Sequence, residues 1–205
     1  MNDSQIRASF HRKCLHKHHR DSATLVIDEL GLQHGRCRAD IAVINGHLIG
    51  YEIKSDADSL RRLKDQIDSY NAVFDHASAI VTARHLSEAM AILPEWWGVI
   101  SVSEGRRGAI HFRTVRRPKR NARVDGYAIT QLLWRDEAQE ILANLGVHGK
   151  KLREKRANLY RCIVSRLDSS ELRKTVREYL IKRTNWRHLA LLSPSDGLSQ
   201  PSATS

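Results

Sequence analysis

The chain has 205 residues, of which 41% are hydrophobic, and it carries a formal net charge of +11. No run of apolar residues approaches the roughly 20 that a membrane-spanning helix needs, and residues 1–20 lack the apolar core of a signal peptide. The three cysteines are odd in number and widely spaced, which argues against a disulfide framework and favours a cytoplasmic protein.

The positive charge is concentrated in the second half of the chain. Residues 1–104 hold 12 Lys and Arg against 14 Asp and Glu, whereas residues 105–192 hold 22 against 8. A near-neutral half joined to a strongly basic half indicates a polyanionic partner, and we expect DNA. An anionic membrane is less favoured because the basic segments lack a Trp/Phe-rich apolar face. RNA ranks last because no aromatic-rich motif for single-stranded RNA is present.

The hydrophobic pattern over residues 1–117 predicts an α/β domain with a hairpin at residues 40–54. The Asn45-Gly46 pair is typical of a turn between two short strands. The His- and Cys-rich stretch before residue 20 has no second cluster at zinc-finger spacing, so we expect a basic surface helix there. The other expected elements are helices at 4–19, 58–74 and 84–92, and strands at 23–29, 77–82, 97–102 and 109–115. The continuous apolar run at 77–82 is typical of a sheet covered on both faces.

The second half predicts a basic, all-α module over residues 118–192, followed by a disordered tail at 193–205. Eight Lys and Arg and no acid lie between Arg106 and Arg123, and Pro118 and Asn121 suggest a linker. We expect three helices with a small core of their own, at 127–145, 150–167 and 170–184, the first stopped by Gly146. The residues expected to contact DNA phosphates are Arg116, Arg117, Lys119, Arg120, Arg123, Lys150, Lys151, Arg153, Lys155 and Arg156.

The hairpin carries an unusual group of charges among apolar residues. Asp40 begins it, and Glu52 and Lys54 share one face of its second strand because strand side chains alternate. Carboxylates set on a small sheet are costly to bury without a partner, and a hard divalent cation such as Mg²⁺ is a natural one. The alternative is an edge hairpin whose charges are solvated.

These residues resemble the D…ExK signature of the PD-(D/E)xK nuclease superfamily. Gln66 and Tyr70 lie downstream at the spacing of the QxxxY motif, which follows ExK in RecB-like members. The wider stretch, from VIDELG through RADIAVINGHLIGYEIKSDADSL to FDHASAIVTARH and PEWWGVI, is similar to a small bacterial family of that superfamily. Ala39 stands where the signature has proline. The resemblance implies a restriction-endonuclease-like core, which is a mixed sheet flanked by helices, in residues 1–117.

The resemblance also implies roles for single residues. Asp40 and Glu52 would hold Mg²⁺ or Mn²⁺ together with the Ile53 carbonyl, and Glu29 is a candidate further ligand. Lys54 would steer the attacking water or offset charge on the phosphorane. Gln66 and Tyr70, four residues apart on one helix face, would reach the same site.

The sequence therefore predicts a metal-dependent deoxyribonuclease whose basic module grips the DNA backbone. The alternative is a catalytically quiet protein of the same fold that binds DNA and recruits another enzyme. Endonucleolytic or exonucleolytic action, strand preference and oligomeric state are left open by the residues.

The metal site also sets a requirement on the hairpin register. Two carboxylates can bind one metal only from the same face of the sheet, but a two-residue turn would pair Asp40 with Tyr51 and send Glu52 to the other face. We therefore expect an odd loop or a bulge. With residues 44–46 as the loop and Gly46 in the left-handed conformation, Asp40 pairs with Gly50. Glu52 is then a diagonal neighbour of Asp40, and Gly50 leaves space for metal and phosphate.

Overall fold

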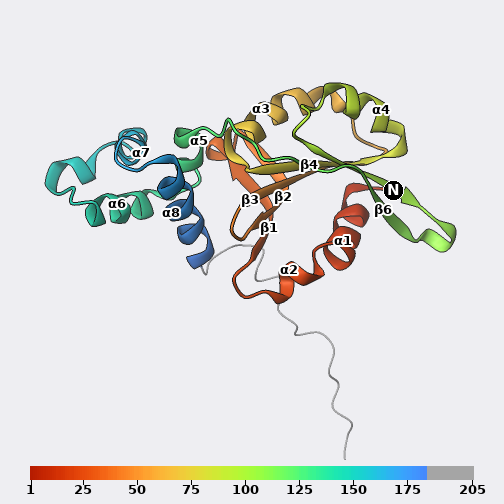
Figure 1. Cartoon of the computed structure of the whole chain (residues 1–205), viewed down its shortest axis with the longest axis horizontal. Helices are drawn as coiled ribbons and strands as arrows, with labels where there is room; N and C mark the ends of the chain where they lie inside the picture. Colours follow the sequence, from red (N-terminus) through yellow and green to blue (C-terminus); the bar gives the residue numbers. More distant parts are fainter. Residues whose placement is uncertain (184–205) are drawn as a thin grey trace, which may run out of the picture.

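The computed structural model describes residues 1–183, and a six-stranded mixed sheet lies at its centre (Figure 1). The strands lie side by side in sequence order: β1 (Leu25–Leu32), β2 (Cys37–Ile44), β3 (Leu48–Lys54), β4 (His76–Thr82), β5 (Gly98–Glu104) and β6 (Ile110–Arg116). The β1–β2, β2–β3 and β5–β6 pairs are antiparallel, and the β3–β4 and β4–β5 pairs are parallel. The predicted mixed sheet with flanking helices is confirmed. The tail at 193–205 lies outside the described residues, as does the end of the predicted module.

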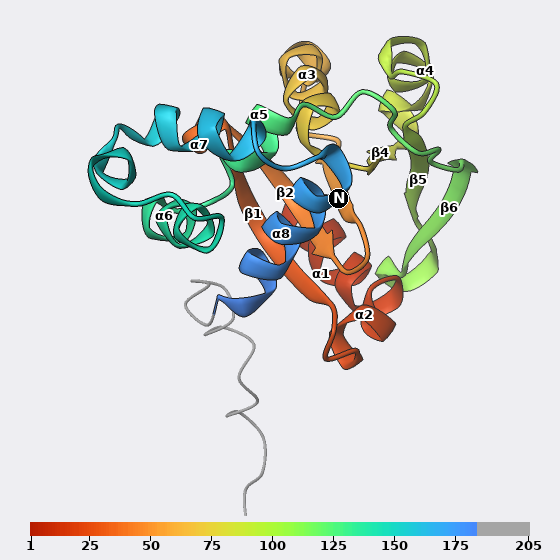
Figure 2. The ribbon, with the colours of Figure 1, turned by 60° about the vertical axis from the view of Figure 1, so that its left-hand side comes forward.

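Helices cover both faces of the sheet (Figure 2). α3 (Leu63–Val73) and α4 (Ala83–Ile92) are the crossovers that the parallel strand pairs require, and both lie on one face. α1 (Asp3–Lys13) and α2 (His16–Arg20) lie on the other face. Because both faces are covered, β4 is buried from its second residue onward, as its apolar run predicts. Within residues 1–183, no helix is long and apolar enough to span a bilayer.

A hydrophobic core lies on each side of the sheet. Ile6 and Phe10 of α1 pack with Ile53 in the smaller core. The larger core lies on the α3 side and contains Phe74 and Trp97, whose side chains are fully buried. Each such side chain contributes about 1.5–3 kcal/mol relative to an exposed position. The sheet is therefore held from both faces, and its strands cannot shift register without exposing one core.

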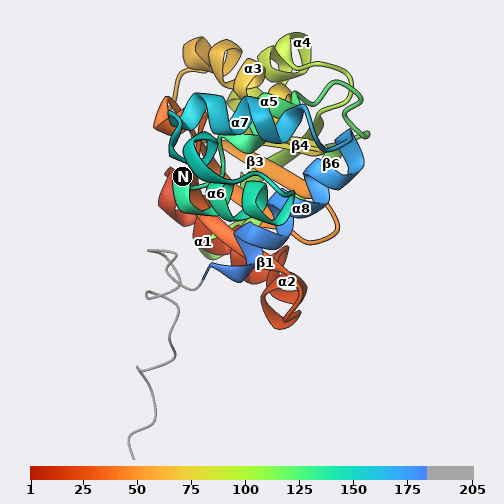
Figure 3. The same ribbon diagram turned by 90° about the vertical axis from the view of Figure 1, so that its left-hand side faces the viewer.

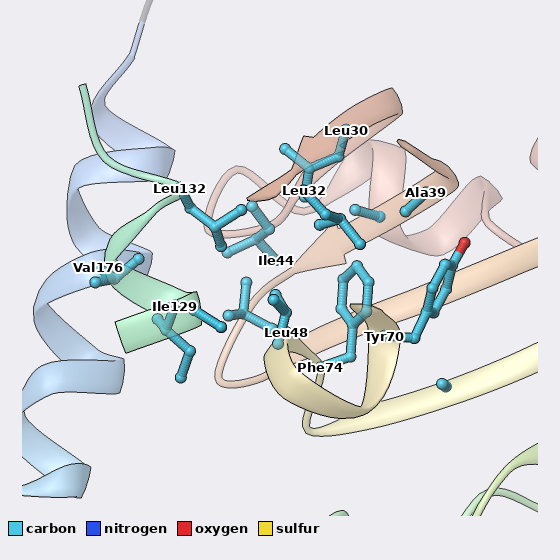
Figure 4. Close-up of a cluster of buried hydrophobic side chains, with 14 of the residues drawn as sticks. Leu30, Leu32, Ala39, Ile44, Leu48, Tyr70, Phe74, Ile129, Leu132 and Val176 are labelled. Atoms are coloured by element: carbon cyan, nitrogen blue, oxygen red, sulfur yellow. The ribbon is translucent and has the colours of Figure 1, made fainter. Parts of the chain in front are cut away.

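The basic helices gather at one end of the molecule and join the larger core (Figures 1 and 3). They are α5 (Gly126–Thr130), α6 (Arg135–Asn144), α7 (Arg156–Val164) and α8 (Ser169–Lys182). Ile129, Leu132 and Val176 belong to the same cluster as Ile44 and Leu48 of the hairpin (Figure 4). The separate helical core that we expected is therefore not formed. The helices after residue 117 complete the core that the sheet begins.

Several predicted helices are shorter or broken in the structure. Leu15 turns into the smaller core, so the helix expected over 4–19 is divided into α1 and α2. The helix expected over 127–145 breaks between α5 and α6, where Tyr160 donates a hydrogen bond to the free carbonyl of Leu133 at 2.7 Å. The segments expected to begin helices at 58 and 150 contain 3₁₀ turns, at Leu60–Arg62 and Gly149–Arg153. Gly146 follows α6 with φ +77°, in agreement with its predicted stop role.

The hairpin has the odd loop that we expected, which places the two carboxylates on one face of the sheet. Residues 45–47 form the loop and Ile44 pairs with Leu48, so the register continues to place Asp40 opposite Glu52 on the same face. The predicted details were wrong, because the loop starts one residue later and Gly46 is outside the left-handed region. The Asn45 side chain accepts a hydrogen bond from the His47 N–H at 3.1 Å, and this contact supports the turn.

We expected Gly50 to leave space for a metal and a phosphate, but this prediction was wrong. Gly50 has a packing role instead. A Cβ at this position would lie 2.7 Å from the Phe74 ring and 2.9 Å from the Tyr70 ring. Both rings belong to the larger core and are fully buried. Glycine at this position allows α3 to approach β3 closely, and this approach brings the Tyr70 hydroxyl to the sheet.

Gly50→Ala should lower the free energy of unfolding by about 1–3 kcal/mol, because the methyl group would overlap rings that cannot move aside. Urea unfolding followed by circular dichroism measures this change. Gly46→Ala is the matched control, since its Cβ would have no neighbour within 4 Å. Equal stability of Gly50→Ala and wild type would contradict the close approach of α3.

Candidate functional site

Three carboxylates lie in a row across the first three strands. Asp28 pairs with Ile41 and Leu30 with Ala39, which leaves Glu29 of β1 opposite Asp40 of β2. The β2–β3 register places Glu52 on the other side of Asp40. The three carboxylates span 23 positions in the sequence, and Asp40 and Glu52 share a face because the hairpin loop has three residues.

Glu52 is the most enclosed of the three and is held by three donors. Its side chain is 1% exposed. Lys54 Nζ and Gln66 Nε2 donate to Oε1 at 2.6 and 2.5 Å, and Tyr70 Oη donates to Oε2 at 2.7 Å. These donors replace the water that burial removes, which makes a buried carboxylate tolerable. The structure thus brings together the Glu, Lys, Gln and Tyr of the predicted motif.

Lys54 and Tyr70 are themselves fixed by further contacts. Lys54 Nζ also donates to Gln66 Oε1 at 3.0 Å, so the glutamine orients both members of the ion pair. Burial, together with the charge of Glu52, raises the pKa of Tyr70 well above its usual value, so its hydroxyl remains a donor at neutral pH. Gln66 and Tyr70 lie one turn apart on α3 and therefore approach Glu52 from the same helix face.

Asp40 is more accessible and is electrostatically crowded. Its side chain is 18% exposed, its Oδ2 accepts from the Ile53 N–H at 2.6 Å, and its Oδ1 accepts from Arg7 Nη2 at 3.3 Å. Burial, and after it the charge of Glu52, raise the pKa of Asp40 to about 7. The negative charge of Asp40 is thus disfavoured beside Glu52, and a divalent cation at this position would offset it.

Arg7 is a member of the site that the sequence did not indicate. It projects from α1, and its Nη2 contacts Glu29 Oε1 at 2.8 Å and Asp3 Oδ1 at 3.1 Å in addition to Asp40. Its Nη1 donates to the Asp40 carbonyl. No local pattern links a residue of the first helix to the hairpin, because the contact depends on how α1 packs on the sheet.

Glu29, the candidate further metal ligand, is engaged by two arginines. Arg7 binds one carboxylate oxygen, and Arg38 Nε lies 3.4 Å from the other. Its backbone has φ +56°, an uncommon left-handed conformation for a residue inside a strand. Among residues 1–183, no group of three His, Cys, Asp or Glu side chains is arranged to hold a metal ion.

A pocket of about 580 Å³ opens over Asp40 and Gln66. The turn between β1 and β2 forms one wall, and the residues around the start of α3 form the other. Three arginines that the sequence analysis did not single out line it, namely Arg36, Arg38 and Arg62. This pocket, and not the packed surface at Gly50, is where a ligand can reach Glu29 and Asp40, whereas Glu52 lies buried behind Gln66.

The predicted DNA-contacting residues lie in two exposed groups. Arg117, Lys119, Arg120 and Arg123 follow β6, and Lys150, Lys151, Arg153, Lys155 and Arg156 surround the start of α7. Arg116 differs from the others. Its guanidinium donates to the carbonyls of Trp97 and Pro94 at 2.7 and 2.9 Å, and this contact fixes the loop after α4.

The raised pKa of Asp40 predicts a pH dependence of stability. Between its ordinary value of 3.8 and about 7, the folded protein retains a proton that the unfolded chain has lost. Stability should therefore fall as the pH rises through this window, and Asp40→Asn should remove that part of the dependence. Urea unfolding of both proteins at intervals between about pH 4 and about pH 7 measures the effect.

The neighbouring carboxylate provides a control for this prediction. Glu52→Gln removes the neighbouring charge and should lower the pKa of Asp40, which carboxyl-carbon NMR reports directly. An Asp40 that titrates near its ordinary value in the wild-type protein would contradict the crowding of the two carboxylates.

Comparison with known proteins gives a family match over residues 3–201, to the family described as Bacteriophage P4 protein cII. Protein cII of Enterobacteria phage P4 is 25% identical over 126 residues, which are 62% of this chain and 47% of the phage protein. The chain thus spans about half the length of this curated relative. Among solved structures, the SPO1766 protein of unknown function from Silicibacter pomeroyi is 18% identical. It matches with a TM-score of 0.39 over 66% of this chain and 90% of its own. Because the family match extends over nearly the whole sequence, the chain belongs to the bacteriophage P4 protein cII family.

Proposed function

We propose that this protein is a metal-dependent nuclease that hydrolyses phosphodiester bonds in DNA. The observation that carries the proposal is the pair Asp40 and Glu52 on adjacent strands, with Lys54, Gln66 and Tyr70 bound to Glu52. A purely structural ion pair would need Glu52 and Lys54 alone. A second, partly exposed carboxylate at the base of a pocket is the arrangement expected of a site for a cation and a phosphate.

The residues present fit Mg²⁺ or Mn²⁺. An ionised carboxylate offers about four acceptor positions, and Glu52 uses three of them in the structure. Asp40 uses one position on each oxygen. Asp40 and Glu52 would hold the ion, together with the Ile53 carbonyl, and the excess negative charge that raises the pKa of Asp40 would be offset. When bound there, such an ion would polarise a phosphodiester oxygen and lower the pKa of a coordinated water.

The protein's own groups then have separate roles. Lys54 would donate to a phosphoryl oxygen and offset charge that develops as water adds to phosphorus and the bond to the leaving oxygen breaks. Gln66 holds the Lys54 ammonium at 3.0 Å and so limits its motion. Tyr70 keeps Glu52 in place by a hydrogen bond and by its contact with the Tyr51 carbonyl at 3.1 Å.

DNA is the proposed substrate because most of the predicted contact residues are exposed and have no evident role in stabilising the fold. Nine of the ten predicted contact residues are exposed, and only Arg116 has its guanidinium bound to backbone carbonyls. Clustered exposed Lys and Arg are the features by which proteins bind a phosphate backbone without reading its sequence.

Asp40→Ala and Lys54→Ala should each lower the cleavage rate about 100-fold or more, the scale of removing one preorganised charge from a reacting centre. The assay uses supercoiled, linear and single-stranded DNA with Mg²⁺, Mn²⁺ or EDTA. Glu52→Ala is a poorer test of cleavage, because it would leave three buried donors without an acceptor and so disturb the fold.

Wild-type cleavage by Asp40→Ala would exclude the nuclease site. Retained DNA binding without cleavage in any metal would instead identify a recruitment protein built on the same fold.

Replacing Lys150, Lys151 and Lys155 with Gln should weaken DNA binding and flatten its salt dependence. Each phosphate contact adds about 0.9 to the log–log slope on duplex DNA, so the triple variant should lose up to roughly three times that amount. Fluorescence anisotropy over a range of salt concentrations measures the slope.

Asp40→Ala is the control and should keep the wild-type slope. A truncation before α5 would not serve, because Ile129 and Val176 belong to the shared core. An unchanged slope in the triple variant would mean that this basic surface is only solvated.

A further inference from the structure

Three arginines line the pocket above Asp40. Arg36 and Arg38 come from the turn between β1 and β2 and from the start of β2, whereas Arg62 comes from the 3₁₀ turn before α3. The arginines therefore stand on two walls, with Asp40 and Gln66 also lining the space. An extended ligand lying across the pocket would meet positive charge on either side of the carboxylates.

Arg36 and Arg62 have no folding role that accounts for them. Both are exposed, and within residues 1–183 neither side chain forms a hydrogen bond or an ion pair. Arg38 differs, because its Nε lies 3.4 Å from Glu29 Oε2. A guanidinium offers a planar fork of donors that matches phosphate, so two such groups beside a pocket suit a ligand with more than one phosphate.

The acidic residues that line the pocket also favour a ligand with several phosphates over a single phosphate. Glu29, Asp40 and Asp65 line the same space as the three arginines. A single phosphate placed there would meet both signs of charge. A chain of phosphates can separate the two charges, because its outer phosphates would contact Arg36 and Arg62 while the middle one lies over Asp40, where the proposed cation would offset the repulsion.

The wall formed by the β1–β2 turn continues into the basic helices. The His34 ring stacks on Tyr160 of α7 with ring centroids 5.7 Å apart and an interplanar angle of 18°. Burial and the charges of Arg156 and Arg36 lower the pKa of His34. The ring contact thus places the β1–β2 wall of the pocket beside α7, whose first residue is Arg156.

We propose that Arg36 and Arg62 bind the phosphates on either side of the scissile phosphate, and that Arg156 guides the same strand from the pocket to α7. The substrate class is then an oligonucleotide chain that spans the pocket, with at least one phosphate on each side of the bond that is cut. This assignment rests on the proposed nuclease function for its choice of ligand. Arg36 and Arg62 are positioning residues for the flanking phosphates and take no part in the bond change.

The test compares Arg36→Gln, Arg62→Gln and the double variant with Arg106→Gln. Arg106 is an exposed arginine in the β5–β6 turn, at the opposite edge of the sheet, and is the matched control. Binding of a fluorescein-labelled oligonucleotide to the full chain is measured by anisotropy in EDTA and in Ca²⁺. Each pocket variant should bind about tenfold more weakly, and should lose about 0.7–0.9 from the log–log salt slope. Arg106→Gln should match wild type.

A second measurement distinguishes binding of the flanking phosphates from reaction at the scissile phosphate. Hydrolysis of bis(4-nitrophenyl) phosphate, a phosphodiester without neighbouring phosphates, should be unchanged in the pocket variants, while KM for DNA rises. Wild-type affinity and slope in the double variant would overturn the assignment, as would an equal loss on the small substrate. If the double variant binds DNA more weakly but the wild-type protein cuts no substrate, the phosphate contacts would be supported and the nuclease function rejected.

Discussion

The structure depends on the burial of one carboxylate. Glu52 is removed from water at the centre of the sheet, and its charge is stabilised only because Lys54, Gln66 and Tyr70 converge on it. That convergence requires α3 to lie close to β3, which the absence of a side chain at Gly50 permits. It also affects Asp40, whose pKa is raised by its own burial and by the charge of Glu52. Packing, hydrogen bonding and the acidity of the site therefore follow from the same local arrangement.

Much of this site could be predicted from the sequence because its parts are close in the chain and obey simple geometry. Alternation along β3 places Glu52 and Lys54 on one face, and a four-residue spacing on α3 brings Gln66 and Tyr70 together. Even the odd hairpin loop follows from the need for Asp40 and Glu52 to share a face. The apolar run of β4 likewise indicated a strand covered on both sides. These predictions rest on periodicities that a strand or a helix imposes wherever it lies in the fold.

The features that could not be predicted all depend on contacts between distant segments. Arg7 reaches Asp40 across 33 residues, and Arg36 and Arg62 meet at one pocket from different elements. The basic helices were expected to form their own core because their apolar positions are sufficient for a small bundle. Those positions pack instead on Ile44 and Leu48, which are apolar residues that the hairpin would otherwise expose. Periodicity shows which face of a helix is apolar, but it does not identify the partner of that face.

The shared core constrains how this family can change. Arg173 of α8 is ion-paired with Asp75, and Asp75 in turn accepts a hydrogen bond from the Leu48 N–H at 2.9 Å. The helical end is thus joined to the hairpin by polar contacts as well as by apolar packing. Exchange of this end for an unrelated domain would uncover the hairpin's apolar face and leave the Asp75 carboxylate without its cation. Recombination between genes of this family should therefore preserve the two halves together, and substitutions at their interface should be correlated.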